Sequence, residues 1–247
     1  MRYQVLLSYN GTNYAGWQIQ PNVLSIQKIL QDILTTMHRH PVMIVGSGRT
    51  DAGVHALGQS FHFDSDMELS VEVWERAMNS QLPKDIIVRK VNQASDHFHA
   101  RFSAVSKRYD YLVNLGAYDP LHYNLEYQVN HSLDIEAMHK ALEIFLGTHD
   151  FASFCANSFD EIPNQIRTIT HFEIQEEGNH LRFILEGNGF LRYMVRMLVG
   201  NLIDVGLHRK TIDQLVMIMD KRDKSATSSI ALACGLYLVR VDYKETA

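Results

Sequence analysis

The chain is poor in cysteine and has no long apolar segment, and each shortage excludes a class of protein. Its 247 residues include only two cysteines, Cys155 and Cys234, which are too few for a disulfide framework or a cysteine-based metal site. No apolar run is long enough to cross a bilayer. The first residues, 1–4, lead directly into an alternating pattern and lack the apolar core of a signal peptide. We therefore expect a cytoplasmic protein that contacts no membrane.

A surplus of positive charge is also missing. The chain has 23 Lys and Arg against 28 Asp and Glu, which is a formal net charge of −5. Because Lys and Arg bind nucleic-acid phosphates by releasing counterions, this balance argues mildly against a nucleic-acid enzyme. A chain of this charge can still bind RNA if its basic residues converge on one cleft. The acidic stretches 64–68 and 173–177 would then lie away from that cleft.

The sequence shows no signature of a cofactor or a metal. Its glycine spacing matches neither the Walker loop nor the dinucleotide fingerprint. The 13 histidines form no HExxH motif and no Cys/His set. We therefore expect neither a cofactor nor a metal. Four histidines could contact phosphates or bases, and the sequence favours none of them: His55, His62, His97 and His99.

Apolar periodicity predicts strands and helices in alternation along the whole chain. Ser25 and Ser70 stand at N-cap positions before two helical stretches. The predicted strands cover 3–9, 42–45, 59–63, 85–91, 107–113, 166–175, 180–186 and 236–243. The predicted helices cover 26–37, 70–79, 135–146, 190–205 and 211–219. The second half repeats the order of elements of the first after a junction at 98–104, so we predict an α+β fold of α/β sandwich type, with domains 1–104 and 105–247.

One glycine-rich loop displays an acid and a base together. Residues 46–59 contain four glycines, and Arg49 and Asp51 lie between them. Glycines permit positive φ angles and close approach of another chain segment, and functional side chains are often carried on loops held by a rigid scaffold. A plain turn with Asp51 as its cap explains such a loop equally well when the loop is taken alone.

The sequence of this loop, Arg49-Thr50-Asp51-Ala52-Gly53-Val54-His55, resembles the catalytic segment of the tRNA pseudouridine synthase A family. The resemblance extends over nearly the whole chain, from Tyr9-Asn10-Gly11-Thr12 to Gly235-Leu236-Tyr237-Leu238. It implies two similar domains with mainly antiparallel sheets flanked by helices, and an active cleft between them. It also implies a homodimer that binds the anticodon arm of tRNA and isomerises uridines at tRNA positions 38 to 40, each after base flipping.

The resemblance implies that Asp51, in the N-terminal domain, is the nucleophile. An ionised and oriented carboxylate is competent for that role. The reaction breaks the N-glycosidic bond of uridine, turns the base and rejoins it through carbon, so it needs no redox change and no cofactor. Whether Asp51 attacks C6 of the base or C1′ of the ribose stays open.

Tyr109 and Arg196, in the C-terminal domain, are the other catalytic candidates. Tyr109 is either a core aromatic or, as the resemblance implies, a ring that stacks on the target base and a hydroxyl that takes a proton in the closing step. Arg196 belongs to a stretch, 190–199, that is apolar nearly all round and therefore predicted to be buried. A buried guanidinium requires a partner. Asp204 or Asp150 could supply it, and the resemblance implies Asp51 instead.

Two further residues are candidates for binding the substrate. Arg49 is either a solvated loop charge or, at the mouth of the cleft, a contact to RNA phosphate or a wedge into the gap left by the flipped base. Leu236 matches the family's apolar residue against the target base, and as a strand residue it is equally explained as plain core.

The sequence departs from the family's usual pattern at three places near these residues. Ser47 replaces a common alanine, which is harmless. Arg192-Tyr193 replaces the commoner aromatic–asparagine pair, and Leu232 replaces a usual proline. The change at Arg192-Tyr193 affects the expected RNA contacts. The change at Leu232 affects the expected shape of the loop before Gly235.

Two other functions fit parts of the sequence. A non-catalytic RNA-binding module of similar fold would not need a carboxylate pointed into a cleft. A nucleoside hydrolase would also use an aspartate at a glycosidic bond, but such enzymes usually need a carboxylate or metal cluster, and this chain has one organised acid.

Overall fold

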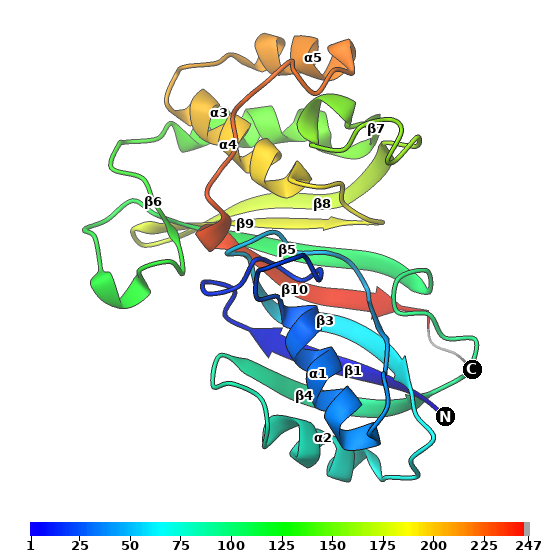
Figure 1. Cartoon of the computed structure of the whole chain (residues 1–247). Helices are drawn as coiled ribbons and strands as arrows, with labels where there is room; N and C mark the ends of the chain where they lie inside the picture. The colour runs from blue at the N-terminus through cyan, green and yellow to red at the C-terminus, as the bar shows by residue number, and fades with distance from the viewer. Residues whose placement is uncertain (245–247) are drawn as a thin grey trace. The chain divides into compact units, whose positions relative to one another are not determined.

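The computed structural model describes residues 1–244, which divide into two units (Figure 1). Unit 1 consists of Met1–Val105 together with the chain from Tyr237 onward, and unit 2 is Ser106–Leu236. The sequence-based boundary after residue 104 assigned the last strand to the C-terminal domain. In the structure this strand belongs with unit 1, because it pairs with a strand near the N-terminus.

Unit 1 contains a mainly antiparallel sheet. Its strand order is β4-β1-β3-β10, and β2 also pairs with β3. All pairs are antiparallel except β10 with β3, which is parallel. The strands are β1 (Arg2–Tyr9), β2 (Ile44–Gly46), β3 (His55–Asp64), β4 (Ile86–Ala94) and β10 (Leu236–Tyr243).

Two capped helices cover one face of this sheet. Ser25 and Ser70 accept the cap hydrogen bonds of α1 (Ile26–His38) and α2 (Val71–Asn79), as their N-cap positions predicted. Trp74 of α2 stacks on His38 of α1 and packs edge-on against Phe63 of β3. Both helices therefore bury their apolar sides on the same face of the sheet.

Unit 2 repeats the combination of a sheet with helices. Its strand order is β5-β9-β8-β7, with antiparallel pairs throughout, and the short β6 pairs in parallel with β5. The strands are β5 (Ala104–Asn114), β6 (Tyr127–Gln128), β7 (Gly147–Asp150), β8 (Ile166–Glu177) and β9 (His180–Gly187). The α+β class with mainly antiparallel sheets, predicted from the sequence, is confirmed.

Three helices lie together on one side of the sheet of unit 2 (Figure 1). They are α3 (Ile135–Leu142), α4 (Met194–Gly206) and α5 (Ile212–Lys221). Helix α4 is buried almost all round, and α5 begins with a capping box at Thr211. Among residues 1–244, no helix is long and apolar enough to cross a membrane.

The start of α4 differs from the prediction of a helix over 190–205. The helix begins at Met194, because Tyr193 has a left-handed backbone, with φ 66°. A helix over 190–205 would place Arg192 and Arg196, four residues apart, on one face. Arg192 instead precedes the helix, so the two residues do not share a helical face. The apolar run continues through the turn, so hydrophobic periodicity alone could not locate the first residue of the helix.

Candidate functional site

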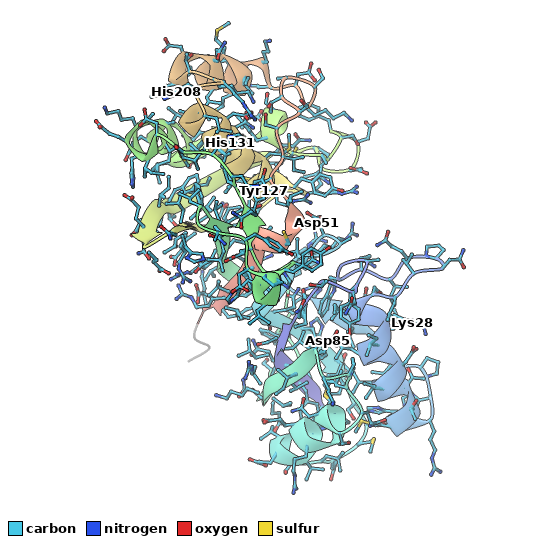
Figure 2. All side chains as sticks on the ribbon, turned by 90° about the vertical axis from the view of Figure 1, so that its left-hand side faces the viewer. Lys28, Asp51, Asp85, Tyr127, His131 and His208 are labelled. Carbon is cyan, nitrogen blue, oxygen red and sulfur yellow. The ribbon has the colours of Figure 1, made fainter. Side chains whose placement is uncertain are left out.

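Asp51 lies in the loop that joins β2 to β3 in unit 1 (Figure 2). The loop is held by the segment that follows β1. The Trp17 backbone N–H donates to the Thr50 carbonyl at 3.0 Å, and the Gly53 N–H donates to the Tyr14 carbonyl at 3.3 Å. These hydrogen bonds lie on either side of Asp51, so its backbone has a defined place on a rigid support.

Gly16 is required for this close approach of two chain segments. Its φ is +86°, and a Cβ atom there would lie 2.4 Å from the Thr50 carbonyl oxygen. Any other residue would both strain the backbone and push against the residue before Asp51. The side chain of Thr50 is held as well, because its buried hydroxyl lies 2.8 Å from that of Tyr9, within hydrogen-bond distance.

The base of the loop is closed by a buried glutamine. Gln59 of β3 accepts a hydrogen bond from the Ser47 hydroxyl at 2.6 Å and donates to the Gly48 carbonyl at 3.1 Å. Ser47 thus has a definite structural role, although it departs from the family's common alanine. Arg49 is exposed on the loop and donates from Nε to the Gln18 side chain at 3.1 Å.

Tyr109 lies in β5 of unit 2 and is 7% exposed. Its ring meets Phe190 edge to face, with centroids 5.2 Å apart, an arrangement that aromatic pairs prefer. Tyr111, two residues further along β5, is fully buried and donates its hydroxyl to the Leu232 carbonyl at 2.7 Å. Tyr111 is therefore a core aromatic residue of unit 2.

Arg196 lies in the first turn of α4 and is half-buried. Its Nε donates to the Ala231 carbonyl at 2.9 Å, and its own carbonyl accepts from the Ala231 N–H at 2.9 Å. Ala231 belongs to a segment, 227–232, that runs along α4. We call it the crossing segment. Through Ala231 it makes one hydrogen bond to the guanidinium and one to the backbone of Arg196.

Tyr193 adds a second contact to the same guanidinium. Arg196 Cζ lies 5.0 Å from the centre of the Tyr193 ring, and Arg192 Cζ lies 4.9 Å from it. Both distances are within the range of a cation–π interaction. The left-handed backbone of Tyr193 costs on the order of 1 kcal/mol. Asparagine, which the family has more commonly at this place, adopts that conformation more readily.

Comparisons with known proteins show the family of this chain. A sequence profile described as tRNA pseudouridine synthase matches residues 6–103 and 141–244. The chain is 40% identical over 244 residues to tRNA pseudouridine synthase A of an Exiguobacterium species, covering 99% of this chain and 98% of that one. It is 41% identical over 244 residues to tRNA pseudouridine synthase A of a Geobacillus species, covering 98% of each. The chain belongs to the tRNA pseudouridine synthase family.

The residues expected to form the active site of a tRNA pseudouridine synthase are distributed between the two units. Unit 1 holds Arg49 and Asp51, and unit 2 holds Tyr109, Arg196 and Leu236. Within unit 2, the Phe190 ring packs on Tyr109, and Arg196 comes shortly after Phe190 in the sequence. Leu236 is 5% exposed where β10 begins. The pairing of Asp51 with Arg196 stays a prediction.

Asp204 and Asp150, the alternative carboxylate partners for Arg196, form other ion pairs. Asp204 lies 3.0 Å from Lys210 Nζ, and Asp150 lies 3.9 Å from Arg222 Nε.

Two of the four candidate histidines have structural positions in this synthase fold. His55 is buried, accepts from the Gly11 N–H at 3.0 Å, and stacks on Tyr237. His62 is buried and accepts from the Ala100 N–H at 3.1 Å. Burial, helped by the positive charge of Arg2, lowers the pKa of His62 to about 4. A neutral, buried imidazole such as that of His62 is a poor ligand for phosphate. Among residues 1–244, no group of three or more His, Cys, Asp and Glu side chains could hold a metal ion.

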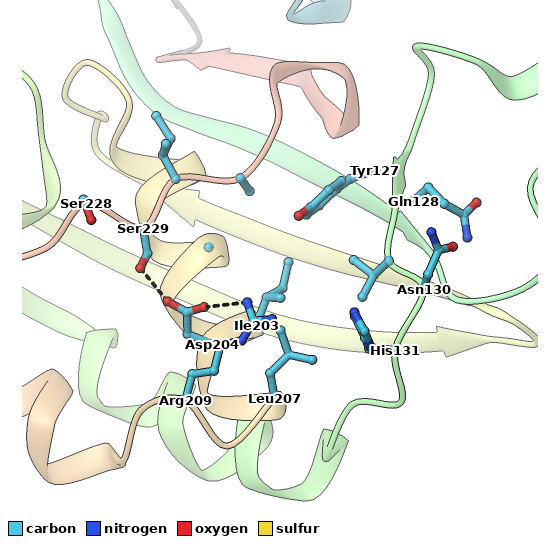
Figure 3. Close-up of a pocket in the computed structure, with 14 residues that line it drawn as sticks. Tyr127, Gln128, Asn130, His131, Ile203, Asp204, Leu207, Arg209, Ser228 and Ser229 are labelled. Atoms are coloured by element: carbon cyan, nitrogen blue, oxygen red, sulfur yellow. Dashed lines mark hydrogen bonds and ion pairs between the residues drawn. The ribbon is translucent and has the colours of Figure 1, made fainter.

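A pocket of about 500 Å³ lies beside the crossing segment in unit 2 (Figure 3). The Asp204 carboxylate on its wall accepts from the Ser229 hydroxyl and pairs with Lys210. Lys210 also donates to the Asn201 and Thr227 side chains, at 2.6 and 3.1 Å. This partly buried polar network binds the crossing segment to α4. The crossing segment therefore both lines the pocket and supports Arg196.

Sequence reasoning missed Ala231, Tyr193 and Gln59. Ala231 acts through its backbone, which leaves no trace in residue type. The left-handed turn at Tyr193 has no signal, because tyrosine does not favour it. Gln59 could have been found, since a polar residue in a strand whose neighbours are buried requires a hydrogen-bond partner.

Proposed function

We propose that this protein isomerises uridine to pseudouridine in the anticodon arm of tRNA, at tRNA positions 38 to 40. The observation that carries the proposal is the Asp51 loop. Its backbone is bonded on both sides of the aspartate, within a chain of the tRNA pseudouridine synthase family. A rigid display of one carboxylate suits a nucleophile, which must be oriented before the reaction.

Each candidate residue has a role in this reaction. Asp51 attacks the flipped uridine and forms a covalent bond to it, the bond between N1 and C1′ breaks, the base turns, a bond between C5 and C1′ forms, and the bond to Asp51 breaks again. Arg196 pairs with Asp51 and keeps it ionised. Tyr109 stacks on the base, and its hydroxyl accepts the proton that C5 loses while it passes its own proton on to solvent; N1 gains one proton, so the proton count of the base is unchanged. The edge-to-face contact of Phe190 with Tyr109 supports the orientation of that ring.

Two residues complete the substrate site in the proposal. Arg49, exposed on the Asp51 loop, contacts RNA phosphate. Leu236 packs against the target base. The proposed reaction involves no redox change and no energy input, so the proposal includes neither a cofactor nor a metal. The negative net charge is accommodated in a homodimer that binds one tRNA with both subunits, and a chain with only two cysteines suits a cytoplasmic enzyme.

Replacement of Asp51 by asparagine tests the proposal. We expect pseudouridine formation in tRNA transcripts, measured by mass mapping, to fall by about a thousandfold or more. The dissociation constant for tRNA should stay within about threefold, because phosphate contacts supply most of the affinity. Asp66→Asn is the matched control, since Asp66 is an exposed carboxylate elsewhere in unit 1, and it should retain full activity.

The same assay separates the two other functions. An RNA-binding module would bind tRNA without forming pseudouridine in the unchanged protein. A nucleoside hydrolase would release free uracil. Substantial turnover by Asp51→Asn, in a preparation free of the unchanged enzyme, would contradict the role of Asp51 as nucleophile.

A further inference from the structure

The N-terminal end of α4 combines an unfavourable backbone with an unusual cap residue. Tyr193 occupies the N-cap position in the left-handed region, with φ 66° and ψ −4°, and its side chain makes no cap hydrogen bond. Ser, Thr, Asp and Asn are the residues that stabilise an N-cap. A left-handed tyrosine is uncommon, and such conformations concentrate at functional sites. The local structure of the helix therefore gives no reason for tyrosine at this place.

The neighbouring backbone is held firmly in this turn. The Ala156 N–H donates to the Arg192 carbonyl at 3.0 Å, and the Arg192 N–H donates to the Asn157 side chain at 2.9 Å. The Tyr193 carbonyl accepts the first helical hydrogen bond, from the Met197 N–H at 2.9 Å. The turn thus fixes the direction in which the Tyr193 ring leaves the chain.

That direction brings the ring against Arg196, whose Cζ lies 5.0 Å from the ring centre. On its Nε, the same guanidinium donates to the Ala231 carbonyl at 2.9 Å. Both contacts are with uncharged groups, so they orient the guanidinium without neutralising its positive charge. An aromatic face attracts a guanidinium through its quadrupole and favours a defined position over the ring.

We propose that Tyr193 is a positioning residue, whose ring holds the Arg196 guanidinium in the orientation that it needs for the reaction. The inference rests on the catalytic role of Arg196 given under the proposed function. The ring and the Ala231 carbonyl act together as a support that restricts the orientations of the guanidinium. The Tyr193 hydroxyl, which Arg192 contacts at 3.3 Å, is not needed for this role.

Three variants of Tyr193 separate the ring from the backbone. Tyr193→Phe keeps the ring, Tyr193→Leu keeps the side-chain bulk without it, and Tyr193→Asn suits the left-handed backbone. Single-turnover rates of pseudouridine formation with saturating tRNA, dissociation constants for tRNA, and melting temperatures should be measured for each. We expect the Phe variant to keep the unchanged rate within about twofold. The Leu and Asn variants should lose about tenfold or more in rate, with tRNA affinity unchanged within about threefold.

The Asn variant distinguishes positioning from a merely structural role. A structural role predicts that asparagine raises both melting temperature and activity, whereas the positioning role predicts an equal or higher melting temperature with a lower rate. A Leu or Asn variant that reacts at the unchanged rate would overturn the inference. A Phe variant as slow as the Leu variant would also overturn it, because the hydroxyl would then matter instead of the ring.

Arg196→Met, measured in parallel, separates failure of this inference from failure of the proposed function. Loss of activity in Arg196→Met together with full activity in Tyr193→Leu would remove only the positioning role. Full activity in Arg196→Met would remove the catalytic role of Arg196, and the inference with it.

Discussion

His62 is a buried histidine whose surroundings keep it neutral. Burial lowers its pKa from 6.5 to about 4, and the charges of Arg2 and His99 act in the same direction. Between pH 6.5 and 4 the unfolded chain binds a proton at this residue and the folded chain does not. The stability of the folded chain therefore falls as the pH decreases through this window.

We expect His62→Asn to remove this part of the pH dependence. An asparagine oxygen can accept the hydrogen bond that the Ala100 N–H now donates to the His62 Nδ1, and asparagine does not titrate. Between pH 7 and pH 5, the unchanged protein should lose about 2 kcal/mol more free energy of unfolding than His62→Asn. Chemical denaturation at the two pH values measures this difference. His97→Asn, at an exposed histidine of the same region, is the control. Equal losses in all three proteins would show that His62 titrates normally.

At the scale of elements, the contact between α4 and the crossing segment depends on Gly200. A Cβ atom on Gly200 would lie 2.8 Å from the Ala231 nitrogen and 3.0 Å from the Ile230 carbonyl carbon. These are backbone atoms, so the crossing segment itself would have to move. Ala231 supplies both hydrogen bonds to Arg196, and the movement would reach that side chain.

We predict that Gly200→Ala lowers the free energy of unfolding by about 1 to 2 kcal/mol, because overpacking exceeds the gain in helix propensity. The single-turnover rate should fall as well, since Arg196 loses its support. Thermal denaturation and the tRNA assay measure the two effects. Gly189→Ala is a suitable control, because its Cβ would approach nothing closer than 3.8 Å. Unchanged stability of Gly200→Ala would show that the segment moves freely.

The ends of the elements show what the sequence could predict. Ser25 and Ser70 located the starts of α1 and α2, because a side-chain hydroxyl that caps a helix is visible in the sequence. The start of α4 was missed, because the turn at Tyr193 depends on contacts with residues 156–157 and 196 instead of local propensity. The Asp51 loop was recognised from its amino-acid sequence. That Gly16 and Gln59 support it was visible only in the structure.

At the scale of the whole molecule, charge is unevenly distributed. Unit 1 is electrically balanced, and the formal excess of five negative charges belongs to unit 2. For such a chain, the proposed homodimer adds basic surface from a second copy. We expect light scattering to give twice the mass of one chain and titration to give one tRNA per dimer. Affinity should fall by about a hundredfold or more between 50 and 200 mM salt. A monomer that binds tRNA with full affinity and activity would contradict the homodimer.

The placement of β10 in unit 1 has a consequence for synthesis on the ribosome. The start of β3, immediately after the Asp51 loop, pairs with β10 through Tyr237 opposite His55 and Leu238 opposite Ala56. These partners are separated by more than two thirds of the chain. Unit 2 is continuous in sequence, so it can fold as soon as it has been translated. Until β10 is made, the start of β3 in unit 1 has an unpaired edge, which is open to wrong partners. The strand that follows the Asp51 loop therefore gains this neighbour only when translation is almost complete.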